Sequence, residues 1–223
     1  MKTQDLQLTF PLTGEWSVVT TPAYRVPSHG TNYLAQRYAF DFTVLDADNA
    51  PIPRSEARKY LISSVYVTNF YAWGREVLSP AAGSIVYTND SVADNYYPSF
   101  IRDMIRMKVL APLNRNTDKR IIFGNYVVVK VGSYFVLLAH LKAGSILVDP
   151  GDKVASGVKI AEVGNSGNAS IPHLHLQAMD QADPRAARAI QCSFSGVEIS
   201  NDLQWTAMPS VVPKKGYRVR NKK

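Results

Sequence analysis

The sequence is poor in cysteine and has no long apolar run, and both absences limit what the protein can be. Cys192 is the only cysteine, so no intramolecular disulfide can form and a four-cysteine metal site is excluded. No window approaches the roughly eighteen consecutive apolar residues of a membrane-spanning helix. The N-terminal stretch up to Trp16 lacks the apolar region and the small-residue cleavage site of a secretory signal. We therefore expect neither a membrane span nor a secretory signal in this sequence.

The composition is that of an ordinary globular protein, with 46% hydrophobic and 19% charged residues in 223. The net charge of +7 favours an anionic partner such as nucleic acid, a membrane surface or an acidic cell-wall polymer. No basic motif is interleaved with aromatic residues, so no specific nucleic-acid partner is predicted. No break in composition divides the chain. We expect one domain over residues 1–205 and a basic, irregular tail over 206–223.

Most of the chain shows the pattern of short β-strands. Runs rich in valine, isoleucine, tyrosine and phenylalanine are separated by glycine, proline and asparagine. Strands are predicted at 38–45, 84–88, 159–164 and 173–179, and residues 125–141 are predicted to form a hairpin that turns at Gly132–Ser133. The sequence therefore predicts a mainly β fold.

Three stretches depart from this pattern. Residues 54–62 fit either a short helix or a charged loop, and residues 185–190 fit a further short helix. Residues 97–113 carry apolar side chains at helical spacing, which predicts an amphipathic helix inside an insert at about 91–120. An apolar stripe of this kind usually packs against the protein, and the other interpretation is a flap over a substrate.

Histidine is also scarce, and two of the four histidines stand side by side in the motif "PHLHLQ". His173 and His175 alternate with leucines, so both imidazoles project from one face of the predicted strand. They lie about 6–7 Å apart along the strand, which favours two different roles: one imidazole on a metal, the other on a water molecule or substrate. The alternative is a pair of exposed histidines on a solvent-facing strand.

His140 and Asp41 occupy unusual places in other predicted strands. His140 ends "YFVLLAHL", where alternation places it on the same face as Val136 and Leu138; this fits a site residue or simply the exit of a strand. Asp41 lies inside "YAFDFTV", where an unpaired carboxylate would be costly to bury. It therefore needs a metal, several hydrogen-bond donors or a salt bridge, for which Arg37 is the nearest candidate in sequence.

Together these residues match a known kind of metal centre. Two imidazoles and one carboxylate are the ligand set of a catalytic zinc that keeps an open position. The remaining two histidines are suited to proton transfer and to stabilising a developing oxyanion. The inventory of four histidines and Asp41 thus fits a hydrolytic zinc site.

The sequence also resembles the lysostaphin-type (LytM-like) zinc metallopeptidases, which are cell-wall endopeptidases. The resemblance is clearest over about 77–180 and is carried by "GNSGNASIPHLHLQ", by "YFVLLAHL" and by "VLSPAAGSIVYT"; "AFDF" at 39–42 resembles a further family segment. It implies an antiparallel β-sheet groove, related to the lipoyl-like β-sandwich, with substrate lying across the sheet.

The resemblance also implies roles for individual residues. Asp41 and His175 would be zinc ligands, and His140 and His173 the catalytic imidazoles. The family's third ligand is a histidine four residues before the aspartate, but that position is Arg37 here. His29 is the remaining histidine and is therefore assigned as the third ligand, with one zinc ion per chain.

Two hypotheses follow from these assignments. The first is a zinc endopeptidase that cuts the stem or cross-bridge peptides of peptidoglycan. Such an enzyme would work in the cell envelope or outside the cell; with another peptide substrate it could be cytoplasmic. The second is a catalytically inactive module of the same fold that recruits or activates other wall hydrolases, which the altered histidine spacing favours. A phosphate-carrying transport domain is disfavoured because phosphoryl transfer between histidines has no use for Asp41.

Overall fold

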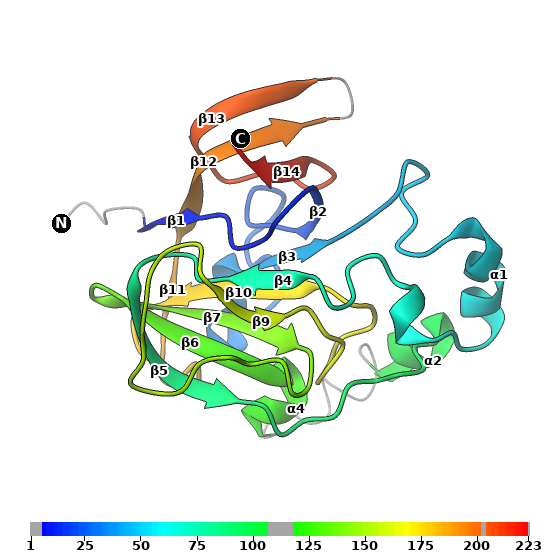
Figure 1. Ribbon diagram of the computed structural model, residues 1–223, viewed down its shortest axis with the longest axis horizontal. Coiled ribbons are helices and arrows are strands. Elements are labelled where there is room, and N and C mark those ends of the chain that lie inside the picture. The colour runs from blue at the N-terminus through cyan, green and yellow to red at the C-terminus, as the bar shows by residue number, and fades with distance from the viewer. Residues whose placement is uncertain (1–5, 107–117, 202–203, 223) are drawn as a thin grey trace.

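The computed structural model describes residues 6–106, 118–201 and 204–222, and it confirms a mainly β protein (Figure 1). The strands are β1 (Leu6–Thr9), β2 (Trp16–Thr20), β3 (Phe40–Thr43), β4 (Glu76–Leu78), β5 (Gly83–Asn89), β6 (Asn125–Val131), β7 (Tyr134–Leu141), β8 (Lys153–Val154), β9 (Lys159–Glu162), β10 (Leu174–Met179), β11 (Ala189–Ile190), β12 (Cys192–Ser200), β13 (Trp205–Val211) and β14 (Arg218–Asn221). The helices are η1 (Tyr33–Tyr38), α1 (Arg54–Ile62), η2 (Val67–Asn69), α2 (Phe100–Ile105) and α4 (Lys119–Phe123).

One sheet of twelve strands organises the described part of the chain. Its main path runs β1-β12-β14-β2-β3-β10-β7-β6-β5-β8, while β11 pairs with β10 and β13 with β12. Neighbours are antiparallel, with the exception of the parallel pair β1 and β12. Strands β4 and β9 form a separate two-stranded sheet. The antiparallel sheet expected from the sequence is therefore present.

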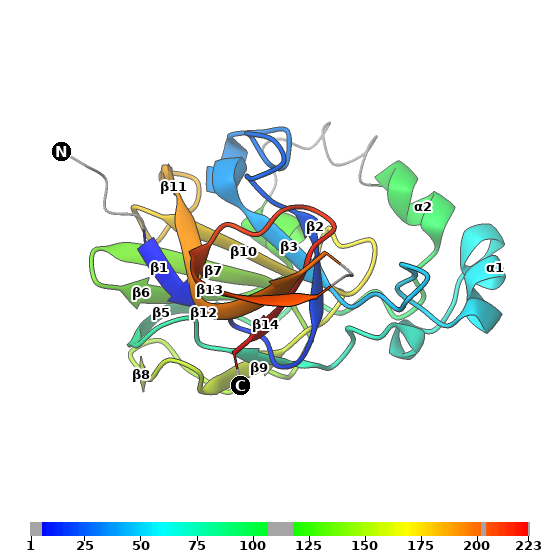
Figure 2. The same cartoon turned by 90° about the horizontal axis from the view of Figure 1, so that it is seen from above.

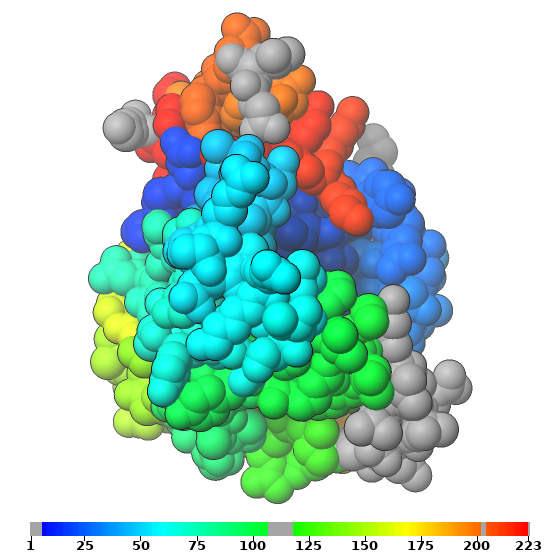
Figure 3. Space-filling model, turned by 90° about the vertical axis from the view of Figure 1, so that its right-hand side faces the viewer, coloured from blue at the N-terminus to red at the C-terminus, as the bar shows by residue number. Residues whose placement is uncertain are grey.

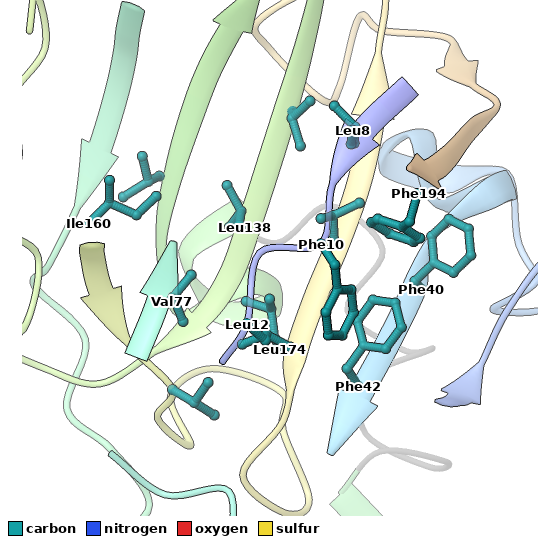
Figure 4. Packing of buried hydrophobic residues seen from close by; sticks show 14 of the residues in the cluster. Leu8, Phe10, Leu12, Phe40, Phe42, Val77, Leu138, Ile160, Leu174 and Phe194 are labelled. Carbon is teal, nitrogen blue, oxygen red and sulfur yellow. The ribbon is translucent and has the colours of Figure 1, made fainter. Parts of the chain in front are cut away.

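The main core lies against one face of this sheet. Leu174 and Leu176 of β10 point into it, beside Leu138 of β7 and the phenylalanines of β3. Figure 4 shows Phe10, Phe40, Phe42 and Phe194 packed together, and four of their ring pairs meet edge to face at 5.1–5.6 Å between centroids. The leucines of "PHLHL" thus fix β10 in place and leave the alternate positions for the opposite face.

The predicted strands are largely confirmed. The hairpin β6–β7 turns at Gly132, whose φ of 59° is left-handed and therefore suits glycine. The strand predicted at 38–45 is shorter than expected, because η1 occupies its first residue and β3 begins at Phe40.

Helix α1 settles the alternatives for residues 54–62 in favour of a helix. Of the helix predicted at 97–113, α2 covers Phe100–Ile105, and residues 107–117 lie outside the described part of the chain. Figure 2 shows α1 and α2 together at one end of the molecule, away from the strands, and Figure 3 looks onto that end. The rings of Tyr60 and Phe100 join the two helices, with centroids 6.0 Å apart.

Two sequence predictions are wrong at the C-terminal end. Residues 185–190 are not a helix: a turn at Asp183 leads into β11, because Asp180 accepts hydrogen bonds from both the backbone and the guanidinium of Arg188. Residues 206–223 are not an irregular tail, since they contain most of β13 and all of β14.

Strand β14 was not predicted from the sequence because its pairing is long-range and several of its side chains are basic. It lies between β12 and β2, and Val219 is fully buried. The guanidinium of Arg220 is bound by Glu198 at 2.8 Å and by Glu15 at 3.2 Å. Pro209 is tolerated in β13 because that strand lies at an edge of the sheet. No helix in the described residues is long and apolar enough to cross a membrane.

Candidate metal centre and its histidines

The pairing of β3 with β10 builds the centre of the site. In the antiparallel register His175 lies directly opposite Asp41, and both side chains point away from the main core. Nδ1 of His175 lies 3.1 Å from Oδ1 of Asp41. The two candidate ligands that are 134 residues apart in sequence are therefore brought together by strand pairing alone.

His29 completes the group from a loop before β3. Its Nε2 lies 3.0 Å from Oδ2 of Asp41, so each carboxylate oxygen faces one imidazole. One nitrogen of each histidine and one oxygen of Asp41 lie within 4.8 Å of one another. The three residues expected to bind metal are thus brought together.

A closed loop explains how His29 reaches this place despite its unusual spacing. The backbone N–H of Ser28 donates to the carbonyl of Arg37 at 2.9 Å, and the Ser28 hydroxyl donates to the carbonyl of Gln36 at 3.2 Å. These two hydrogen bonds close the segment from Ser28 to Arg37 at its base and hold His29 beside β3. Arg37 itself donates to Asn32 and Tyr38, so it is not the partner of Asp41 that its position in sequence suggested.

In His29 and in His175, the ring nitrogen that points away from Asp41 has a hydrogen-bond partner of its own. That partner influences which nitrogen of the ring carries the proton. Nδ1 of His29 lies 3.1 Å from the Ser28 hydroxyl, whose proton goes to Gln36. Nε2 of His175 lies 2.9 Å from Oε1 of Gln177, an acceptor. A neutral ring has one protonated nitrogen, so the neutral form of either ring would carry its proton on the outward nitrogen and a lone pair toward Asp41, whereas the imidazolium form donates to Asp41.

His140 reaches the site through a β-bulge, and the face predicted for it is wrong. Residues 139 and 141 of β7 pair with consecutive residues of β6, Tyr126 and Asn125, so His140 is the extra residue. Its φ of 61° is left-handed, which is uncommon for a side chain other than glycine. The bulge turns the imidazole away from the face of Val136 and Leu138, as bulges near active sites commonly do.

His140 and His173 form a second pair of imidazoles beside the first group. Their ring centroids lie 4.6 Å apart, and Nε2 of His173 is 3.7 Å from Oδ1 of Asp41. Nδ1 of His140 donates to the carbonyl of Ser166 at 2.9 Å, and Nδ1 of His173 donates to the carbonyl of Ile171 at 2.8 Å. Nε2 of each neutral ring therefore carries the lone pair.

All four histidines and Asp41 border one small cavity of about 100 Å³. The interpretation of His173 and His175 as exposed residues on a solvent-facing strand is therefore wrong, since His175 is 2% exposed and His173 half-buried. The other lining residues are Gln36, Ile122, Phe123 and Asn168.

The surroundings of the cavity favour the charged form of Asp41 and the neutral form of His140, because they lower the pKa of both groups. Burial alone would raise the pKa of Asp41, but the three neighbouring imidazoles outweigh burial and hold that pKa well below its usual range. Burial, followed by the nearby imidazoles of His173 and His175, lowers the pKa of His140 well below its usual value. The carboxylate is thus charged and His140 is neutral at pH 7.

Comparison with known proteins connects this site to a family of peptidases. Residues 107–187 match the model of Peptidase family M23. The family resemblance is confirmed. This stretch includes His140, His173 and His175 of the candidate site. His29 and Asp41 precede it, so their place in the site rests on the geometry described above.

Individual M23 relatives are more distant or match over shorter stretches. The chain is 38% identical over 61 residues to the peptidoglycan DD-endopeptidase ShyA of Vibrio cholerae; this covers 27% of the chain and 14% of that relative's length. Among solved structures, the catalytic domain of lysostaphin from Staphylococcus simulans is 17% identical, with a TM-score of 0.40 over 79% of this chain and 88% of that one. The catalytic domain of the prophage-encoded M23 protein EnpA from Enterococcus faecalis is 14% identical, with a TM-score of 0.42 over 78% and 88%.

Sequence reasoning missed the residues that orient the imidazoles. Ser28 lies in a loop and Gln36 in the short helix η1, and neither segment has a recognisable sequence pattern. Gln177 carried a usable signal, because it follows His175 by two positions and alternation places both on the same face of β10.

Proposed function

We propose that this protein is a zinc-dependent endopeptidase that hydrolyses the peptide cross-links of bacterial peptidoglycan. The observation that carries the proposal is the arrangement of His29, Asp41 and His175, with two further imidazoles on the same cavity. The resemblance to the M23 peptidases also supports it, because that match includes His140, His173 and His175, although not His29 and Asp41.

The three residues fit zinc in chemistry and in spacing. Two lone-pair nitrogens that face a buried carboxylate are compatible only with a proton or a cation between them. Zinc bonds of about 2.0–2.2 Å place neighbouring ligand atoms of a tetrahedral site roughly 3.4 Å apart, close to the separations of 3.0 and 3.1 Å around Asp41. Bound zinc supplies a Lewis acid that polarises a carbonyl and acidifies water.

The remaining imidazoles supply the proton transfers of peptide hydrolysis. His140 is neutral at pH 7, so its Nε2 accepts the proton of the attacking water and can return it to the leaving amine. His173 also lines this cavity, and in the imidazolium form, with a proton taken from solvent, its Nε2 would donate a hydrogen bond to the oxyanion of the tetrahedral state. The backbone carbonyls of Ser166 and Ile171 keep both rings in the orientation that these roles need.

Peptidoglycan is the proposed substrate on two grounds. The curated relative with the matching segment is named for a peptidoglycan DD-endopeptidase activity, and the charge of +7 favours binding to an anionic wall polymer. This function places the protein in the cell envelope or outside the cell, where the polymer lies.

The test is hydrolysis of isolated peptidoglycan with and without a chelator, with zinc content measured on the same samples. We expect Asp41→Ala to lose both zinc and activity. His140→Ala should keep zinc and lose at least about a hundredfold in activity, the usual contribution of a general base. Asp48→Ala removes an exposed carboxylate near the start of α1 and serves as the matched control, with zinc and activity unchanged.

Release of wall peptides by Asp41→Ala or by His140→Ala at the wild-type rate would overturn this mechanism. A wild-type protein that binds wall material but holds no zinc and releases no peptide would instead identify the inactive regulatory module.

A further inference from the structure

Gln177 is a buried amide with no role in the proposed chemistry. It lies two residues beyond His175 on β10 and is fully buried. Its Oε1 lies 2.9 Å from Nε2 of His175, and its Nε2 lies 2.8 Å from the carbonyl oxygen of Leu34 and 3.2 Å from Sδ of Met179. A buried amide is costly unless both ends are paired, and here both ends are.

We infer that Gln177 is a positioning residue that fixes the tautomer and the orientation of His175 for metal binding, and that the carbonyl of Leu34 fixes the orientation of Gln177. The inference rests on the proposed function for the metal. It adds a residue outside the ligand set and a backbone group from η1, neither of which lines the cavity.

The direction of the amide follows from its partners. A backbone carbonyl can only accept a hydrogen bond, so the NH₂ end of Gln177 must face Leu34. The oxygen end then faces His175 and can only accept, which requires a proton on Nε2 of the imidazole. In the neutral ring the lone pair is thereby left on Nδ1, the atom that faces Asp41. If the amide were reversed, the proton would move to Nδ1 and the ring could not bind a cation there.

The backbone that supplies the Leu34 carbonyl is itself unusual. Leu34 and Ala35 have φ values of 55° and 58°, both in the left-handed region that residues other than glycine rarely adopt. Both are 2% exposed and pack in one apolar cluster with Phe123 and Met179. Packing therefore holds this segment in a conformation that isolated chains avoid, and the conformation aims a carbonyl at Gln177.

Zinc affinity is the first readout, measured by competition with a chromogenic chelator on the full chain. Gln177→Met keeps the length of the side chain and removes the acceptor, and we expect zinc to dissociate 10- to 100-fold more readily, as when other outer partners of ligating histidines are lost. Gln177→Glu keeps an acceptor for His175 but loses the donor to the Leu34 carbonyl, so its affinity should lie between those of the wild type and of Gln177→Met. Gln181→Met, two residues beyond β10 on the exposed surface, is the matched control and should not change the affinity. A wild-type affinity in Gln177→Met would overturn the inference.

The second readout is the tautomer of His175, which is measured on the wild-type protein without zinc and without any substitution. In metal-free wild-type protein at about pH 8.5, where imidazoles are largely neutral, ¹⁵N NMR should show His175 protonated at Nε2. Protonation at Nδ1 would overturn the inference. If the wild type binds no zinc at all, the proposed function fails, and the tautomer alone then decides whether Gln177 orients His175.

Discussion

At Asp41, each carboxylate oxygen faces an imidazole nitrogen whose proton lies on the other side of the ring. Oδ2 faces His29 and Oδ1 faces His175, and the outward nitrogens are held by Ser28 and Gln177. A carboxylate and two lone pairs repel one another unless a proton or a cation lies between them. At the scale of single residues, the proposed metal centre therefore depends on the orienting partners as well as on the ligands.

His140 gives a prediction for the stability of the metal-free protein. Its pKa in the folded chain is well below the ordinary value of 6.5, chiefly because the ring is buried. As the pH falls below 6.5, His140 binds a proton in the unfolded chain but not in the folded chain. The free energy of unfolding therefore decreases by up to about 1.4 kcal/mol per pH unit.

The test compares wild-type protein with His140→Ala in urea unfolding between pH 5 and pH 7.5, with chelator present. The variant should lose this part of the slope, so that the difference in stability between the two proteins shrinks toward pH 5. Parallel curves across the whole range would contradict the neutral, buried state of His140.

The residues of the site were largely predictable from the sequence, but their orientation was not. His173 and His175 follow from alternation, and Asp41 follows from the cost of burying a carboxylate in a strand. His140 was assigned to the wrong face of its strand, because a bulge is set by the pairing of two strands and leaves no periodic signal. The alternative of an Arg37 salt bridge failed because Arg37, in η1, donates to Asn32 and Tyr38 instead.

At the scale of elements, the loop "GNSG" holds His140 by close backbone packing. The carbonyl of Ser166 accepts from His140, and the Ser166 hydroxyl donates to the carbonyl of Leu141 and accepts from the backbone N–H of Asn125. Gly167 has a φ of 68°, and a Cβ there would lie 2.3 Å from the backbone nitrogen of Gly124. The glycine is therefore required for approach as well as for conformation.

Gly167→Ala tests this packing against a matched control. Gly157 also has a left-handed φ, of 81°, but a Cβ there meets nothing within 4 Å. Gly157→Ala should cost only the conformational strain, about 1–2 kcal/mol. Gly167→Ala should cost about 1–3 kcal/mol more because backbone must move, and it should lower peptidoglycan hydrolysis by displacing Ser166 from His140. Equal losses of stability in chemical denaturation, with activity retained in both variants, would contradict the role assigned to this loop.

Elements with a local, regular sequence pattern were predicted correctly, whereas elements held by long-range contacts were missed. The hairpin β6–β7 and helix α1 were predicted because their patterns are local and regular. Strand β14 was missed because basic residues next to a chain end resemble a solvated tail, whereas its burial depends on β2, about 200 residues earlier in the chain. The turn and short strand at 183–190 were missed for a similar reason, since Asp180 directs that segment back onto β10.

At the scale of the whole molecule, the main core and the candidate site lie on opposite faces of the large sheet. The main core packs against one face, and the histidines and Asp41 lie on the other, over the central strands β3, β10 and β7. The strands near both ends of the described chain, β1 and β14, lie in the same sheet on either side of β12 (Figure 1). Segments from distant parts of the sequence thus support one site, and two of the three proposed ligands, His29 and Asp41, lie outside the stretch that matches the peptidase family.

The most direct test of the proposed metal centre is a crystal structure of the zinc-loaded protein with anomalous data on both sides of the zinc absorption edge. The proposal predicts one strong anomalous peak per chain, in contact with Nε2 of His29, an oxygen of Asp41 and Nδ1 of His175, and its loss in Asp41→Ala. A peak elsewhere, or no peak at this site in protein loaded with an equivalent of zinc, would contradict it.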